Sequence, residues 1–220
     1  IDMSGVEFKK IGGDNGFVGD FNGNNHKISN VTYISETEDN VGFFSNVFES
    51  SIYDITFENV NIKGRSYVGG VAGSAYNVTM NNVRVDGNVE CEIGYAGGIC
   101  GTATGAVFYN LRNSANVYSK YLYDSESDDG NEDYCTGGIC GYLAGSLMYS
   151  LNEGMVVAAV HGTMVGGLVG KAGNSVARAN IDFSINLGDV CGREYIGGIV
   201  GASKYGFVRK CVNAGYVKST

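Results

Sequence analysis

The sequence predicts an all-β fold, a parallel β-solenoid with coils of about 29 residues, and three observations support this. A glycine-rich block recurs along the chain, and a second block follows it in phase. Glycine accounts for 35 of the 220 residues, and proline is absent. Glycine supplies turns with positive φ, and a chain without proline suits strands that pair on both sides.

The first block reads Gly-Gly-apolar-x-Gly. Its copies start 28, 40, 29 and 31 residues apart, at Gly69, Gly97, Gly137, Gly166 and Gly197, and a weaker copy lies at 41–45. A period near 29 with short apolar runs and glycine corners is typical of solenoid coils with two or three strands each. A helical repeat fits poorly, because segments such as 165–169 lack apolar residues at helical spacing.

The second block reads Gly or Ala, any residue, then Val. In four of its five copies an asparagine stands two residues before the Gly or Ala, at Asn113, Asn152, Asn186 and Asn213. Equivalent positions of successive coils stack on one another. We therefore expect these amides to form a ladder in which each side chain bonds to the next coil.

The repeats define the predicted organisation of the chain. Residues 1–14 precede any repeat and are expected to form an N-terminal cap or lead-in strand, and 15–220 form the repeat domain of six or seven coils. The spacing of 40 predicts an acidic loop insertion at 121–134 that bulges from one edge. Because uncapped solenoid ends expose strand edges, we expect further domains to flank this segment in a longer protein.

The net charge of the chain and the distribution of its basic residues exclude some classes of binding partner. The net charge is -8, and lysines and arginines form no stripe, which argues against nucleic acid and anionic membranes. No run of about 18 apolar residues exists, so we expect no membrane insertion by this segment. The two histidines, His26 and His161, are interpreted as structural residues.

Residues 165–170, Val-Gly-Gly-Leu-Val-Gly, and their sister copies resemble the GLUG repeat of bacterial cell-surface proteins. Residues 17–31 resemble the first coil that often precedes such repeats, so the resemblance spans about 15–217. It implies a right-handed parallel β-helix of the pectate-lyase-like kind, secreted or displayed on a bacterial surface within an adhesin-like protein. Similar repeats flank some surface peptidases, including the immunoglobulin A peptidase group. The chain has no HExxH motif, so any catalytic domain is expected outside it.

The acidic insertion is the predicted metal site. Calcium prefers several oxygen ligands, and the first carboxylates of the insertion follow an EF-hand-like spacing at Asp124, Glu126, Asp128 and Asp129. The sixth position of that pattern is Asp129 where an EF-hand loop has glycine, and Cys135 stands where the bidentate Glu belongs. A solvated acidic loop without a metal is the alternative, and no other cofactor is expected.

Tyrosines beside the insertion are the predicted binding residues. Tyr121, Tyr123 and Tyr134 stand next to its carboxylates and would contact a sugar or a protein partner. The alternative is that they pack the base of the loop onto the coils.

The cysteines are interpreted as small buried residues. Cys100 and Cys140 occupy the block position that is Ala72, Val169 or Val200 in other copies. We expect most thiols to be free and buried. Disulfides between Cys100 and Cys140 or between Cys91 and Cys135 remain open alternatives, because spacing cannot decide them.

These patterns favour a non-catalytic adhesion or interaction module that also acts as a rigid spacer of a bacterial surface protein. The chain is predicted not to be an enzyme, and its expected partner is a host protein or a glycan. The alternative is a carbohydrate-active β-helix enzyme of the polysaccharide lyase or hydrolase type. That alternative requires carboxylates and basic residues to line up on one face of the coils.

Overall fold

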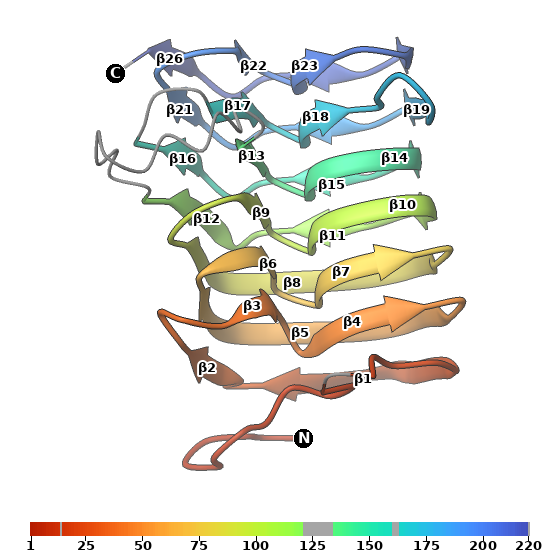
Figure 1. Cartoon of the computed structure of the whole chain (residues 1–220), viewed down its shortest axis with the longest axis vertical. Helices are drawn as coiled ribbons and strands as arrows, with labels where there is room; N and C mark the ends of the chain where they lie inside the picture. The colour runs from red at the N-terminus through yellow and green to blue at the C-terminus, as the bar shows by residue number, and fades with distance from the viewer. Residues whose placement is uncertain (14, 121–133, 160–162, 220) are drawn as a thin grey trace.

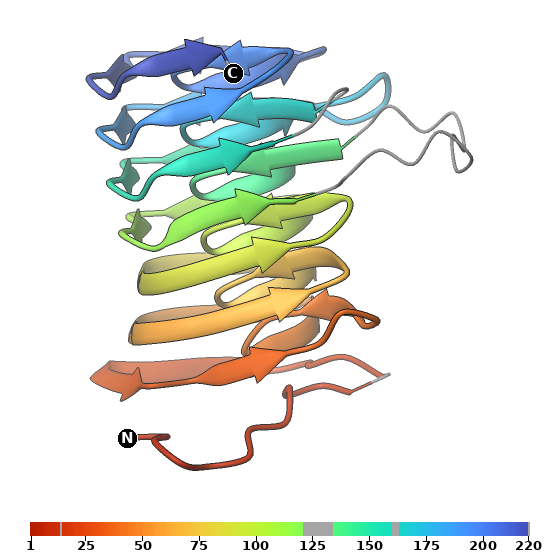
Figure 2. The same cartoon turned by 90° about the vertical axis from the view of Figure 1, so that its left-hand side faces the viewer.

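The computed structural model describes residues 1–13, 15–120, 134–159 and 163–219, which form one elongated stack of coils (Figure 1). Each coil lies on the previous one, from the N-terminal coil at one end to the C-terminal coil at the other (Figure 2). The chain is an all-β, right-handed parallel β-helix of about six turns, which confirms the predicted fold class. Across the described ranges, no helix is long and apolar enough to cross a bilayer.

The short sheet of the helix is built from the residues that enter each Gly-Gly block. Its strands run parallel and in register from coil to coil. They are β3 (Asp39–Val41), β6 (Ser66–Gly69), β9 (Tyr95–Gly97), β13 (Tyr134–Gly137), β17 (Thr163–Gly166) and β22 (Ile196–Gly197).

The long sheet wraps around the remaining walls. The strands that leave the Gly-Gly block are β4 (Phe44–Phe48), β7 (Ala72–Tyr76), β10 (Cys100–Tyr109), β14 (Cys140–Met148), β18 (Val169–Ala172) and β23 (Val200–Ser203). The other strands are β1 (Asp20–Ser29), β2 (Thr32–Ile34), β5 (Ser51–Gly64), β8 (Thr79–Cys91), β11 (Arg112–Asn113), β12 (Asn116–Ser119), β15 (Leu151–Asn152), β16 (Val156–Ala158), β19 (Ala179–Asp182), β20 (Ile185–Asn186), β21 (Val190–Gly192), β24 (Gly206–Arg209), β25 (Val212–Asn213) and β26 (Val217–Ser219).

The predicted asparagine ladder is confirmed inside the helix. Asn113 Nδ2 donates to Asn152 Oδ1 and Asn152 Nδ2 to Asn186 Oδ1, each at 2.8 Å, and the chain of bonds continues to Asn213 at 2.7 Å. Each amide also donates to the backbone carbonyl two residues later, such as that of Gly154. Asn113, Asn152 and Asn186 are fully buried, so these bonds satisfy polar groups that water cannot reach.

The Gly-Gly turns press directly on this ladder. A Cβ on Gly98 would lie 2.3 Å from the Asn113 side chain, and one on Gly138 would lie 2.3 Å from that of Asn152. Contacts this short leave no room for any side chain. The two blocks stay in phase along the sequence because the glycine of one block lies against the asparagine associated with the other.

One corner of the coils holds residues with left-handed backbone conformation, and we call it the αL corner. Each member comes directly after a residue that pairs in register with its counterpart in a neighbouring coil. The φ angles of the members lie between 50° and 54°. They are Asp54, Asn82, Asn110, Tyr149, Phe183 and Lys210. Asn and Asp adopt this conformation readily, whereas aromatic residues rarely do. The corner therefore changes from favourable residues in the early coils to unfavourable ones in the later coils.

We predict that Asn152→Ala destabilises the protein by about 2–3 kcal/mol, because it leaves buried partners in Asn113, Asn186 and Gly154 without their hydrogen bonds. Urea unfolding followed by circular dichroism measures the change. The exposed Asn88→Ala serves as control and should change stability by less than about 0.5 kcal/mol. Equal effects of the two substitutions would show that the ladder does not stabilise the fold.

Candidate functional site

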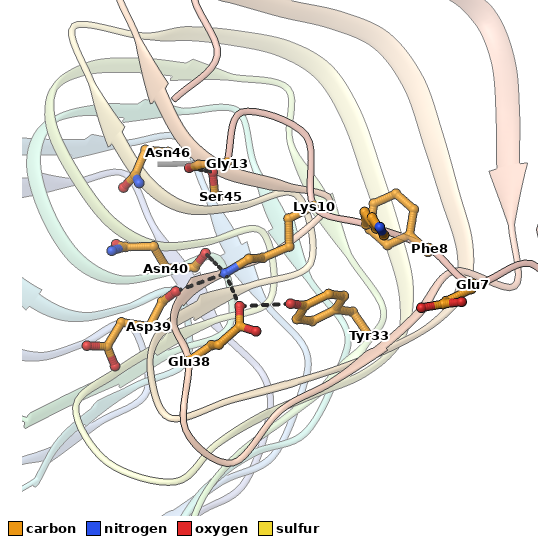
Figure 3. Close-up of a pocket in the computed structure, with 11 residues that line it drawn as sticks. Glu7, Phe8, Lys10, Gly13, Tyr33, Glu38, Asp39, Asn40, Ser45 and Asn46 are labelled. Atoms are coloured by element: carbon orange, nitrogen blue, oxygen red, sulfur yellow. Dashed lines mark hydrogen bonds and ion pairs between the residues drawn. The ribbon is translucent and has the colours of Figure 1, made fainter. Parts of the chain in front are cut away.

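A cavity of about 660 Å³ lies where the N-terminal residues 1–13, which we call the lead-in segment, cross the corner after β2 (Figure 3). Phe8 and Lys10 line it from the lead-in segment, and Tyr33, Glu38 and Asn46 line it from the coils. Its size falls within the range of ordinary ligand sites. The aromatic rings of Phe8 and Tyr33 and the hydrogen-bonding groups of the other side chains all border this cavity.

Lys10 is the centre of this cavity. Its ammonium donates to Glu38 Oε2 at 2.8 Å and to the backbone carbonyls of Asp39 and Asn40 at 3.2 and 3.4 Å (Figure 3). The Tyr33 hydroxyl donates to the same carboxylate at 2.8 Å. The hydrogen bonds from Lys10 and then Tyr33 lower the pKa of Glu38, while burial and Glu38 raise the pKa of Tyr33 to about 12.

This arrangement determines what the cavity can do. All three N–H groups of the Lys10 ammonium have acceptors, and its charge is matched by Glu38. Lys10 therefore acts as a clamp that ties the lead-in segment to the coil. The other side chains that line the cavity include the Phe8 ring and the Asn46 amide, so the cavity can contact a polar molecule with an apolar part.

A second surface runs along the wall formed by β11, β15, β20 and β25, and we call it the ladder face. Its outward row consists of the residue just before each ladder asparagine and of the residues that pair with this position in β5 and β8. Register pairing places these residues in one row: Thr56, Arg84, Arg112, Leu151, Ile185 and Val212. The row changes from polar and charged to apolar between Arg112 and Leu151.

The early half of the ladder face carries ion pairs. Arg112 forms a bidentate pair with Glu153 at 2.7 and 2.8 Å, and this pairing lowers the pKa of Glu153. Arg84 and Asp54 line a cavity of about 210 Å³ with Asn82. Arg84 and Arg112 therefore stand in register on this face, with the carboxylates of Asp54 and Glu153 beside them.

The later half of the ladder face carries apolar side chains, which we call the apolar patch: the exposed Tyr149, Met155, Phe183, Ile185 and Leu187 and the half-buried Leu151. The Tyr149 and Phe183 rings stack with centroids 5.0 Å apart and an interplanar angle of 6°. Leu151 pairs in register with Ile185. Single exposed apolar residues are common on soluble proteins, whereas a contiguous group with a charged rim is typical of an interaction surface.

The rim beside the patch is charged. Arg209 forms a bidentate pair with Asp182, both bonds at 2.8 Å, and this contact lowers the pKa of Asp182. The Lys210 ammonium lies 4.6 Å from the centre of the Phe183 ring. These groups and Tyr149 line a cavity of about 340 Å³.

Most of the sequence-predicted site residues fall outside the described ranges. Asp124, Glu126, Asp128, Asp129, Tyr121 and Tyr123 all lie in the undescribed segment 121–133. Tyr134 begins β13, where it is half-buried and pairs with Thr163. Within the described ranges, no group of three or more His, Cys, Asp or Glu side chains is placed to hold a metal ion. Calcium binding by the insertion stays a prediction.

The cysteine prediction is confirmed. All six cysteines are in the thiol form, and Cys91, Cys100, Cys135 and Cys140 are buried. Cys100 and Cys140 are register partners in β10 and β14. Burial raises the pKa of the Cys91 thiol to about 12, and burial followed by the neighbouring Cys100 raises that of Cys140. Thiols held protonated in this way are poor nucleophiles.

Sequence reasoning missed both the Lys10 cavity and the apolar patch. The sequence does indicate the apolar patch at the residue before each ladder asparagine. This residue is Arg112 in one coil and changes to Leu151 and Ile185 in the next two. The pairing of Lys10 with Glu38 has no such signal, because it depends on the path of the lead-in segment.

We predict that Glu38→Gln lowers stability at pH 7 by up to about 1 kcal/mol, because Glu38 is partly exposed and water screens its ion pair. The folded pKa of Glu38 lies below its ordinary value of 4.5, so its contribution is present above that value and is lost as the pH falls through the folded pKa. The difference between wild type and variant should vanish at low pH in urea unfolding. Glu7→Gln, which removes another carboxylate lining the same cavity, is the matched control.

We also predict six titratable thiols in the denatured, non-reduced protein. In the native protein, only the half-buried Cys191 and Cys211 should react quickly with Ellman's reagent, since the other four are shielded from it. A denatured count of four or fewer would show that disulfides form.

No protein-family model matches this sequence, and no curated protein matches it. A search of solved structures finds a chain from Bacteroides ovatus named as a "putative immunoglobulin A1 protease", with a TM-score of 0.78 and 21% sequence identity. The match covers 100% of this chain and 68% of that one. At this identity the likeness shows the fold.

The comparison corrects one sequence-based prediction. The expectation that the chain is not an enzyme is contradicted, because a protein with the same β-helix carries the name of a peptidase. The expectation rested on short contiguous motifs such as HExxH. Peptidase groups also come together from distant segments, so a missing motif is a weak argument.

Proposed function

We propose that this chain is the β-helix with which an extracellular bacterial peptidase holds its protein substrate. The apolar patch on the ladder face carries this proposal. A contiguous apolar surface with aromatic residues inside a charged rim suits a protein partner better than a small polar ligand. The name of the structural relative points to the same class of partner.

The geometry explains why a β-helix suits this task. Interior positions fix the coils against one another, so the outward row can vary from coil to coil without disturbing the core. The substrate would rest on the later coils, which present Tyr149, Ile185 and Leu187. We propose immunoglobulin A1, the substrate in the relative's name, as the first partner to test. Secretion or display on a bacterial surface is part of the proposal.

A second candidate function is carbohydrate processing, which the early half of the ladder face favours. Arg84 and Asp54 share a polar cavity there, and Arg112 stands in register with Arg84 in the next coil. Incubation with a polysaccharide panel followed by size-exclusion chromatography tests it. Shortened polymers would support this candidate.

We predict that the purified chain binds immobilised immunoglobulin A1 in surface plasmon resonance, and that Ile185→Glu weakens binding at least tenfold. The substitution puts a charge in the apolar patch at a position that is 40% exposed, where the fold tolerates it. Thr56→Glu, on the polar half of the same row, is the matched control and should leave binding unchanged. Gel electrophoresis of the incubated antibody reports any cleavage in the same experiment.

Absence of binding to immunoglobulin A1 would contradict the proposed partner. Binding that Ile185→Glu and Thr56→Glu reduce equally would contradict the apolar patch as its site. Circular dichroism of both variants shows that they keep the wild-type fold.

A further inference from the structure

The αL corner beside the apolar patch carries two residues that the fold itself does not favour. Tyr149 has φ of 53° and Phe183 of 50°, in a region that aromatic residues rarely adopt. The equivalent residues of earlier coils are Asp54, Asn82 and Asn110, which suit this conformation. Side chains that cost stability at a position where asparagine fits point to a role outside folding.

The arrangement of the two rings indicates how they are used. They stack on each other along the helix axis, and Lys210 covers the far side of Phe183. On its other side, the Tyr149 ring is met by the tilted ring of Tyr109, with centroids 5.2 Å apart. Both rings therefore have neighbours along the helix axis, which leaves their edges for contact with a partner. Stacking on the flat face of a sugar is disfavoured by this geometry, whereas apolar side chains of a polypeptide can pack against ring edges.

The charges beside the rings indicate the chemistry of the partner. Arg209 is paired with Asp182, while Lys210 has no carboxylate within ion-pair distance among the described residues. The cavity bordered by Tyr149 and Phe183 thus holds two cations and one anion, although the whole chain carries a net charge of -8. A surplus positive charge next to an apolar cavity complements a carboxylate next to an apolar side chain.

We infer that Tyr149 and Phe183, with Lys210, form the anchor for a polypeptide segment in which apolar and acidic side chains alternate. This inference rests on the proposed function in placing the partner on the apolar patch, and it adds which residues hold the partner and what sequence they select. The apolar side chain fills the cavity at the ring edges, and the carboxylate reaches the Lys210 ammonium.

The test uses two fluorescein-labelled peptides, one alternating glutamate with leucine and its twin with lysine in place of glutamate, in fluorescence polarisation. We expect the acidic peptide to bind at least tenfold more tightly than its twin, and added salt to weaken it. The double substitution Tyr149→Asn with Phe183→Asn should abolish binding, while its melting temperature stays within a few degrees of wild type because asparagine suits the αL corner. Lys210→Gln should weaken only the acidic peptide.

Tyr195→Asn is the matched control, since Tyr195 is an exposed aromatic residue with φ of 47° outside the αL corner. It should leave peptide binding unchanged. The inference would be overturned if the acidic peptide did not bind or if the two peptides bound equally. Binding that survives the double substitution would overturn it as well. Antibody binding that depends on Ile185 with no peptide binding would refute the anchor alone. Peptide binding without antibody binding would refute immunoglobulin A1 alone.

Discussion

The pairing of each coil with the next, fixed in register by the buried asparagine ladder, is the constraint on which the rest of the structure depends. Each ladder amide bonds to the coil above it and to its own backbone two residues on. The Gly-Gly turns approach the same amides so closely that a methyl group would not fit. A ladder asparagine therefore requires glycine opposite it, and a substitution at either position disturbs the packing of the neighbouring coils.

This constraint divides each coil into positions that must repeat and positions that are free. Inward residues repeat in kind, as Cys100 and Cys140 do with Ala72 and Val169. Outward side chains do not enter the interior, so their type is not fixed by the packing of the core. The ladder face can therefore change from Arg112 to Leu151 in one step without disturbing the interior, and different coils of one regular helix present different chemistry.

The same division explains what the sequence could predict. The period, the ladder and the buried cysteines were readable because inward positions repeat the same residue types at a fixed spacing. The apolar patch was not found, because the residues before the ladder asparagines change in type from coil to coil and their contiguity appears only when coils are stacked. The Lys10 clamp joins a non-repeating segment to a coil corner, which no periodicity reveals. The acidic insertion was predicted to be a site from its composition, and its residues 121–133 lie outside the described ranges.

The αL corner shows how function is added to such a helix. Every coil needs a left-handed residue there, and asparagine would satisfy that need throughout. Replacing it with Tyr149 and Phe183 makes the backbone less favourable, and the stacked rings recover part of that cost. The remaining cost is spread over a long stack of paired coils, so the fold tolerates it. A repetitive scaffold can thus hold an unfavourable pair of aromatic side chains at its edge, where a partner can reach them.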